Sequence, residues 1–305
     1  MSTQHAAGRY APSPSGDLHV GNLRTALLAW LFARTTGRRF LIRMEDLDRA
    51  VAGADARQLA DLASLGMDWE TPVVYQTQRR DIYGGIIDRL RKDGRTFECF
   101  CTRREILEAP SAPHAPQGAY PGTCRNLTDA ERAEKIAAGR PPAIRILADT
   151  TEFTVTDLLH GTFTGMVDDF VIQRNDGTPA YNLAVVVDDA AQGVDQVVRG
   201  DDLLSSAPRQ AYLATLLDET PPTYAHVPMV LNTDGVRLSK RDGAVTLADL
   251  AADGVPATTV LSHIARSLDL ADPGETVDLP TLASRFDPDA LPREPWLLGP
   301  TEWSS

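Results

Sequence analysis

Residues 9–22 read Arg9-Tyr-Ala-Pro-Ser-Pro-Ser-Gly-Asp-Leu-His-Val-Gly-Asn22, and the elements around this stretch indicate the architecture of the chain. Its two prolines and first glycine favour a loop and exclude a helix over residues 12–16. From about Val20 to Thr36, apolar residues recur with helical spacing, at Leu23, Leu27, Trp30 and Leu31. Gly37 is expected to end this helix, and Phe40-Leu-Ile-Arg-Met44 predicts a strand. Strand, helix and strand at this spacing form a βαβ unit, which predicts a parallel sheet.

The middle of the chain has a different pattern. Residues 79–92 and 128–139 have helical spacing, Thr96 to Cys101 looks extended, Pro110 to Pro121 is a proline-rich loop, and 143–172 alternates as strands do. These patterns predict an antiparallel segment inserted between two parallel parts.

Parallel-type patterns return after the insertion. The apolar run Ala184-Val-Val-Val187 before Asp188-Asp189 predicts the end of a buried parallel strand, and Val197-Val198 before Arg199-Gly200 predicts another. We therefore expect an α/β fold with a doubly wound parallel sheet. Its halves span 1–95 and 179–250, with an inserted α+β subdomain over 96–178 and a short helical region over 251–305.

The composition is that of an ordinary globular protein. With 305 residues, of which 43% are hydrophobic and 24% charged, the chain can form a large core. Its longest apolar run, Ala26 to Ala33, is too short to span a membrane, and Met1 to Arg9 lacks the apolar core of a signal peptide. Three cysteines are too few for a disulfide scaffold. We expect a cytoplasmic monomer that does not contact membranes.

The net charge of −12 is unevenly distributed. Residues 251–305 hold nine acids against three bases, whereas residues 79–145 hold thirteen bases against nine acids. A nucleic acid would be attracted to the middle segment and repelled by the carboxyl-terminal one. A solvated face would give the same counts.

The stretch Pro12 to Asn22 also predicts an anion site. The chain has neither G-x-G-x-x-G nor G-x-x-x-x-G-K-[ST], but this loop leads into a helix, whose first N–H groups are free to bind a phosphate. Gly21 would let a flat base approach the backbone, and His19 can donate a hydrogen bond to a phosphate oxygen. The alternative is a proline-rich turn with a surface histidine.

A second basic motif, Arg237-Leu-Ser-Lys-Arg241, precedes Asp242-Gly243. The chain has three lysines, Lys92, Lys135 and Lys240, beside many arginines. The ammonium of Lys240 is a compact charge suited to a developing pyrophosphate. The alternative is a solvated basic turn.

Together the two motifs resemble the HIGH and KMSKS signatures of class I aminoacyl-tRNA synthetases, and the match is closest to the glutamyl type. Six ordered blocks carry the resemblance: Arg9-Tyr-Ala-Pro-Ser-Pro-Ser-Gly16, Arg43-Met-Glu-Asp-Leu-Asp48, Tyr181-Asn-Leu-Ala-Val-Val-Val-Asp-Asp189, Val198-Arg-Gly-Asp-Asp-Leu203, Pro208-Arg-Gln210 and Arg237-Leu-Ser-Lys-Arg241. Asn22 stands where HIGH ends in histidine, which weakens a catalytic role for this position.

The resemblance implies a site for glutamate. Arg9 and Arg199 would hold the two carboxylates, Glu45 the ammonium, and Tyr181 would add a hydroxyl, with Tyr10, Ala11, Pro12 and Ser13 lining the same loop. Guanidinium groups suit carboxylates because they bind them in a fork. Alternatively these charges form salt bridges, and Glu45 and Asp46 cap a strand end.

The resemblance also implies a site for ATP with Mg²⁺ over His19, Gly21 and Asn22, with Lys240 at the phosphates and with Lys240 and His19 as the catalytic pair. Attack of the α-carboxylate on the α-phosphate needs alignment and charge stabilisation rather than a covalent nucleophile.

A third group of residues indicates a metal. Cys99 and Cys101 would point to one side of a strand, and Cys124 could join them on one zinc ion. Buried free cysteines are the alternative. Ligand chemistry alone favours His114 as fourth ligand, whereas Cys-x-Cys followed by Tyr-x-x-x-Cys resembles the zinc site of glutamyl-queuosine tRNA(Asp) synthetases and implies Tyr120.

That subfamily is the expected one. Glutamyl-tRNA synthetases continue into a helical region that reads the anticodon, whereas this sequence ends at Ser305 after an acidic stretch. The resemblance then implies transfer of glutamate to the queuosine base of tRNA(Asp), with adenylate formed before tRNA binds. The alternatives are a shortened glutamyl-tRNA synthetase that charges a tRNA 3′ end and a non-catalytic paralogue that binds tRNA or an amino acid. Retention of Arg9, Glu45, Arg199 and Lys240 together argues against the paralogue.

Overall fold

The computed structural model describes residues 6–108, 119–238, 245–299 and 303. Within them, a seven-stranded sheet has the order β3-β2-β1-β9-β10-β6-β7. Its strands are β1 (Ala7–Tyr10), β2 (Arg39–Met44), β3 (Glu70–Tyr75), β6 (Glu152–Asp157), β7 (Gly161–Met166), β9 (Val194–Gly200) and β10 (Thr223–Val227). All neighbours are parallel except the β6–β7 hairpin, so the predicted, mostly parallel α/β fold is confirmed.

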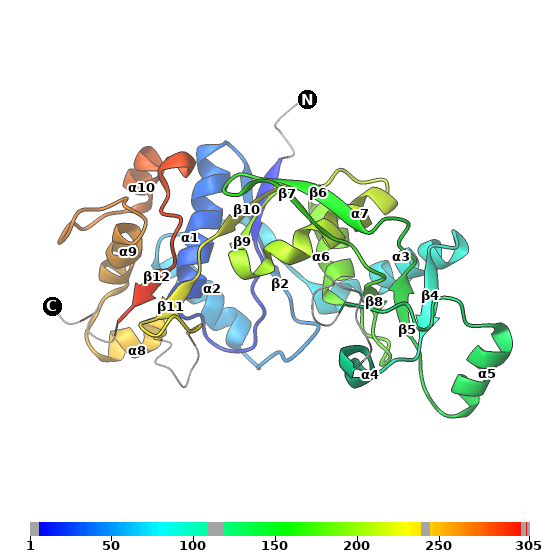
Figure 1. The fold of residues 1–305 in the computed structure, drawn as a ribbon. Helices are drawn as coiled ribbons and strands as arrows, with labels where there is room; N and C mark the ends of the chain where they lie inside the picture. Colours follow the sequence, from blue (N-terminus) through cyan, green and yellow to red (C-terminus); the bar gives the residue numbers. More distant parts are fainter. Residues whose placement is uncertain (1–5, 109–118, 239–244, 300–302, 304–305) are drawn as a thin grey trace.

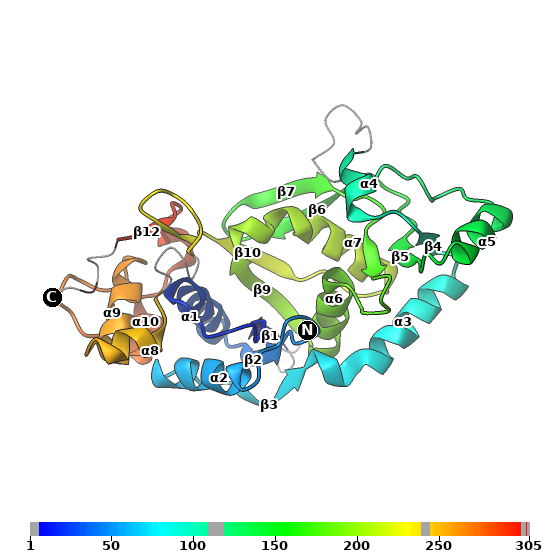
Figure 2. The same cartoon turned by 90° about the horizontal axis from the view of Figure 1, so that it is seen from below.

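Helices cover both faces of this sheet (Figures 1 and 2). On β2, Phe40 and Ile42 belong to the same apolar cluster as α1 (Val20–Thr35), while Leu41 between them belongs to a separate cluster that includes Ala207 and Ala211 of α7 (Ala207–Leu216). The alternation follows from the two-residue period of a strand. The inner strands β1, β2, β9 and β10 are mostly buried, whereas the outer strands β3, β6 and β7 are partly exposed.

Helix α1 runs through the larger core cluster and is apolar on nearly every side, as expected for a buried helix. It begins with a capping box: the His19 side chain accepts from the Asn22 backbone, and the Asn22 side chain accepts from the His19 backbone. Gly37, with φ of 70°, lies just beyond its end and supplies the left-handed conformation predicted for a stop.

One predicted element is wrong. Residues 184–187 do not form a strand but lie inside helix α6 (Tyr181–Gln192), which ends at Gly193 in the left-handed conformation. Every residue from Leu183 to Asp189 is buried, so the run is apolar on all sides of the helix. A short apolar run of this kind cannot be told from a buried strand by periodicity.

The remaining elements lie at the two ends of an elongated molecule (Figures 1 and 2). At one end is an antiparallel sheet of β4 (Thr96–Cys99), β5 (Ala143–Ile146) and β8 (Val171–Gln173), with α4 (Arg103–Glu108) and α5 (Asp129–Ala137). At the other are α8 (Leu247–Ala252), α9 (Ala257–Arg266), α10 (Leu279–Arg285) and the parallel pair β11 (Val230–Asn232) and β12 (Trp296–Leu298). Helices α2 (Ala54–Ser64) and α3 (Arg80–Lys92) and the short 3₁₀ turns η2 (Gln76–Arg79), η3 (Asp201–Ser206) and η4 (Pro288–Ala290) complete the described chain. None of the described helices is both long and apolar enough to cross a membrane.

Candidate active site

A cleft of about 900 Å³ opens at the carboxyl ends of β1 and β9. Strand β1 lies between β2, which follows it through α1, and β9, which belongs to the later part of the chain. In open parallel sheets, ligands bind where the strand order reverses in this way. Eleven of the residues predicted for glutamate or ATP line the cleft: Arg9, Tyr10, Ala11, Pro12, Ser13, His19, Gly21, Asn22, Glu45, Tyr181 and Arg199. Lys240 lies outside the described residues, but Arg237 and Leu238 of the same motif reach the cleft wall.

Arg9 is buried at the end of β1 and is fixed by an acid that sequence reasoning missed. Its Nε donates to Oδ1 of Asp189 at 3.2 Å, its Nη2 to Oδ2 at 3.5 Å, and its Nη1 to the Val198 carbonyl at 3.4 Å. A guanidinium has five N–H groups, so two of them have no partner among the described residues and can bind a ligand. Burial alone would raise the pKa of Asp189, but Arg43 and Arg9 outweigh burial and lower it.

Arg43 forms hydrogen bonds to both Asp189 and Glu45. Its side chain is fully buried, and Nη1 donates to Oδ1 of Asp189 at 2.6 Å while Nη2 donates to Oε1 of Glu45 at 3.4 Å. Burial raises the pKa of Glu45, and the attraction of Arg43 and Arg9 does not fully offset it. In the described chain, the Glu45 carboxylate accepts from Arg43 alone, so it keeps acceptor capacity for an ammonium. Asp46, by contrast, accepts from the backbone N–H and the hydroxyl of Thr77 in η2.

Arg199 faces the cleft from the end of β9. Its Nη1 donates to Oε1 of Gln210 at 2.7 Å and to the Tyr181 hydroxyl at 3.3 Å. Its Nη2 donates to the Leu203 carbonyl at 3.3 Å and its Nε to Nε2 of His226 at 3.0 Å. Within the part of the chain that the structure describes, four of the five N–H groups are thus engaged, and one can bind a ligand. Gln210 stood inside a recognised block, but its partner could not be predicted because Arg199 lies on another element.

The other end of the cleft is formed by the start of α1. Nδ1 of His19 accepts from the Asn22 N–H at 3.3 Å, which places the ring proton of the neutral form on Nε2. Burial, and next the charge of Arg237, lower the pKa of His19, so the ring is neutral and Nε2–H is the donor available. Asn22 acts as a helix cap, which gives a structural reason for asparagine at this position.

Gly21 keeps this wall open. A Cβ there would lie 3.0 Å from Cε1 of His19 and 3.3 Å from Cβ of Val230, closer than most side-chain contacts. Across the cleft, Nη2 of Arg237 lies 2.7 Å from Oδ2 of Asp202 on η3. The basic motif is therefore joined to the cleft by an ion pair.

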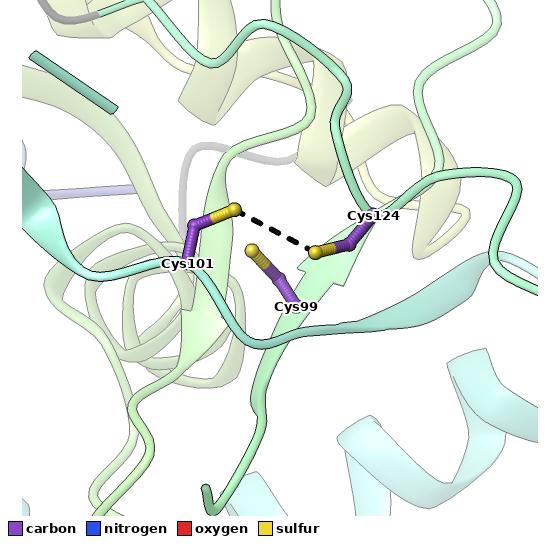
Figure 3. A group of neighbouring side chains, drawn as sticks. All are labelled: Cys99, Cys101 and Cys124. Atoms are coloured by element: carbon purple, nitrogen blue, oxygen red, sulfur yellow. Dashed lines mark hydrogen bonds between the residues drawn. The ribbon is translucent and has the colours of Figure 1, made fainter. Parts of the chain in front are cut away.

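The three cysteines form a compact cluster in the small sheet region (Figure 3). Their sulfur atoms point toward one another and lie within 4.8 Å, with Cys101 and Cys124 at 3.6 Å. The Tyr120 hydroxyl is 3.4 Å from Sγ of Cys99 and accepts from the Cys124 N–H at 2.8 Å. Sulfurs bound to one tetrahedral zinc ion at about 2.3 Å lie roughly 3.8 Å apart, so this donor set fits zinc. His114 lies outside the described residues.

Comparisons with known proteins agree with this geometry. Residues 6–286 match the family described as tRNA synthetases class I (E and Q), catalytic domain. The chain is 65% identical over 294 residues to the glutamyl-Q tRNA(Asp) synthetase of Nocardia farcinica, covering 96% of this chain and 93% of that one. It is 55% identical over 283 residues to the enzyme of the same name from Cutibacterium acnes, covering 90% and 80%. A crystal structure of a glutamate tRNA ligase from Elizabethkingia meningosepticum in complex with its amino acid superposes with a TM-score of 0.81 at 26% identity, covering 98% of this chain and 68% of that one.

Proposed function

Because the chain belongs to the class I tRNA synthetases of the E and Q type, and within them to the glutamyl-Q tRNA(Asp) synthetases, we propose that it activates glutamate with ATP and transfers it to queuosine in the anticodon of tRNA(Asp). It is a ligase. A shortened glutamyl-tRNA synthetase that charges a 3′ end is the competing function.

One observation carries the proposal: the charges in the cleft complement those of glutamate. In the described chain, Arg9 and Arg199 keep N–H donors without a partner, and both line the same cleft as the carboxylate of Glu45. Two guanidinium groups and one carboxylate match two carboxylates and one ammonium. Tyr181, hydrogen-bonded to Arg199, adds a hydroxyl at the same wall.

The chemistry that this arrangement supports is alignment and charge stabilisation. We propose that Arg9, Glu45 and Arg199 orient glutamate so that its α-carboxylate faces the α-phosphate, and that Nε2–H of His19 donates to a phosphate oxygen. Gly21 gives the base access to the backbone, and Lys240 stabilises the pyrophosphate as it leaves. Mg²⁺, when bound with ATP, neutralises phosphate charge.

We further propose that Cys99, Cys101, Tyr120 and Cys124 hold one structural zinc ion, with His114 as the competing fourth ligand. We retain the division at residues 95, 178 and 250 as a proposal for domain organisation, in which the segment 96–178 also contributes β6 and β7 to the edge of the seven-stranded sheet. A monomer acting in the cytoplasm is also proposed.

The test of activation is glutamate-dependent exchange of pyrophosphate into ATP with no tRNA present. We expect exchange with glutamate and none with aspartate or glutamine, because every proposed contact to the amino acid comes from this chain. An absolute requirement for tRNA would favour the shortened glutamyl-tRNA synthetase.

The test of transfer compares tRNA(Asp) with and without queuosine, each with and without its 3′ terminal adenosine. A vicinal diol on the base can accept an acyl group as a ribose does, and the product is an ester labile to mild alkali. We expect transfer to queuosine-containing tRNA irrespective of the 3′ adenosine. Loss of transfer with that adenosine would establish 3′ charging instead.

A further inference from the structure

Beneath Arg199 lies a buried acid–histidine pair that the sequence motifs did not include. His226 lies on β10 and Asp157 on β6, and both side chains have 0% exposure. His226 contacts Nε of Arg199, which lines the cleft, but His226 itself does not line it. We call these two residues the Asp157–His226 pair.

The hydrogen bonds fix the proton on the ring. Oδ2 of Asp157 lies 2.6 Å from Nδ1 of His226 and accepts the backbone N–H of His226 at 3.0 Å. Its Oδ1 accepts the N–H groups of Leu159 and His160 at 2.8 and 2.9 Å. An ionised carboxylate only accepts, so Nδ1 carries the proton and Nε2 is left as an acceptor.

The acceptor points at Arg199. Nε2 of His226 receives the Nε–H of Arg199 at 3.0 Å, and a guanidinium can only donate. The ring must therefore stay neutral. Burial, together with the charge of Arg199, lowers the pKa of His226 despite the hydrogen bond to Asp157. For Asp157, burial is outweighed by hydrogen bonds from His226 and neighbouring backbone groups, which lower its pKa to about 2.

Arg199 is held at three further points. Gln210 and Tyr181 accept from one terminal nitrogen and the Leu203 carbonyl from the other, so the His226 contact is the one that fixes Nε. Four bonds on a planar group fix both its position and its plane, which determines where the remaining N–H points. A small rotation would move that N–H away from a ligand.

We propose that the Asp157–His226 pair positions Arg199 to bind a carboxylate of the amino-acid substrate. Both are positioning residues, because neither lines the cleft. The inference rests on the proposed function, since it takes Arg199 as a carboxylate ligand. The competing explanation is that His226 only fills the core, stacked on Tyr224 with ring centroids 5.6 Å apart.

Two matched variants separate these explanations. In His226→Gln, the amide oxygen can occupy the place of Nε2 and accept from Arg199, but the contact to Asp157 is lost. In His226→Asn, the shorter amide can occupy the place of Nδ1 and donate to Asp157, but the contact to Arg199 is lost. Each removes one half of the connection, and both leave the backbone bond to Asp157.

The experiment measures KM for glutamate, KM for ATP and the maximal rate of ATP–pyrophosphate exchange. We expect His226→Asn to raise the glutamate KM roughly ten- to hundredfold, the scale of one lost hydrogen bond to a charged group. His226→Gln should stay within about threefold, and the ATP KM should be unchanged in both. The opposite order, or equal effects, would overturn the proposal.

A double-variant cycle shows whether His226 acts through Arg199. In an Arg199→Lys background, which lacks Nε–H, His226→Asn should raise the glutamate KM by no more than about twofold, because the contact is already gone. A full additional effect would contradict the inference. If His226→Asn fails to fold, a tenfold rise of glutamate KM in His226→Gln alone would also overturn it.

Failure of the proposed function is distinguishable from failure of this inference. In the first case the unsubstituted protein shows no glutamate-dependent exchange, whereas in the second it does and the two histidine variants do not differ as expected.

Discussion

At the scale of single residues, the cleft depends on acids shared between basic side chains. Asp189 accepts from both Arg9 and Arg43, and Asp188 accepts from Arg79 at 2.6 Å while its other oxygen accepts from Tyr83 at 2.8 Å. Buried charges are tolerated when they are paired and hydrogen-bonded, and removal of one partner leaves the other uncompensated. The positions of the residues that would contact glutamate therefore depend on these acids.

Asp189→Asn should weaken both stability and substrate binding. We expect the free energy of unfolding to fall by about 3 kcal/mol or more, as for other broken buried pairs, and the glutamate KM to rise at least tenfold. Urea denaturation and exchange kinetics measure the two effects. Because the folded-state pKa of Asp189 is lowered, this stabilisation is present above the unfolded pKa of about 3.9 and is lost as pH falls through the folded value.

A matched control for that variant is Asp218→Asn, whose carboxylate is exposed and pairs with Arg89 at the surface. It should change neither glutamate KM nor, beyond about 1 kcal/mol, stability. Equal effects of the two substitutions would refute a special role for Asp189.

Glu45→Gln should separate binding from stability. The pKa of Glu45 is raised in the folded protein, so folding favours its protonated form; this contribution is present below the unfolded pKa and is lost as pH rises through the folded one. At pH 7 the melting temperature of the Glu45→Gln variant should therefore be no lower than that of the unsubstituted protein. Any excess in its melting temperature should become smaller as the pH is lowered. Glutamate affinity, measured by calorimetry, should fall because the ammonium loses its counter-charge. A markedly lower melting temperature would indicate a structural role.

Lys240→Ala should lower the adenylation rate about a hundredfold or more, the usual scale for a preorganised charge at a transition state. Calorimetric glutamate affinity should hardly change, and Lys135→Ala on α5 serves as a control. If the adenylation rate decreases by less than about tenfold, Lys240 is not a catalytic residue.

At the scale of elements, periodicity predicted α1, α3, α5 and β2 to within one or two residues, and the run Val197-Val198 marked the end of a strand, β9. Periodicity failed at α6, because the run Ala184–Val187 is buried all round. That difference matters for the site: from this helix Asp188 accepts from Arg79 and Asp189 accepts from Arg9, and both partners lie more than a hundred residues away in sequence. Sequence patterns report local spacing and contain no information on such partners.

The cysteine cluster leads to a prediction about zinc binding and about the stability of the small antiparallel sheet. The protein should contain one zinc ion per chain with three sulfur ligands and one oxygen, measured by metal analysis and X-ray absorption. Cys101→Ser should lose the ion and loosen β4 against β5, since metal binding and folding are coupled. A metal-free protein of equal stability would show that the cysteines are simply buried.

The fourth ligand is tested separately. Tyr120→Phe keeps the ring beneath the guanidinium of Arg145, 3.7 Å away, but removes the oxygen. We expect it to weaken zinc binding, whereas His114→Ala should not. The reverse result would assign the position to His114.

At the scale of the whole molecule, the motifs predicted the fold class and gathered eleven described residues at one cleft. The supporting residues Asp157, His226 and Gln210 could not be assigned in the same way, because their importance lies in what they contact rather than in their own type. The count of basic and acidic residues over 79–145 was also a limited guide to nucleic-acid binding. In the basic segment, Arg95, Arg104 and Arg140 are already in ion pairs with acids, so the net count overstates what a nucleic acid would meet.

The interior position of β1, between β2 and β9, has a consequence for synthesis. Arg9 and its partner Asp189 are separated by 180 residues, and β9, which pairs with one edge of β1, follows still later. A ribosome adding roughly 5–20 residues per second needs on the order of 10 to 40 s to cover that distance. During this interval the nascent chain carries β1 with one edge unpaired, and open strand edges are templates for association with other chains. Early protection of this edge, rather than the stability of the finished fold, would then set the yield of active protein, and pulse proteolysis of chains arrested before and after residue 200 would measure it.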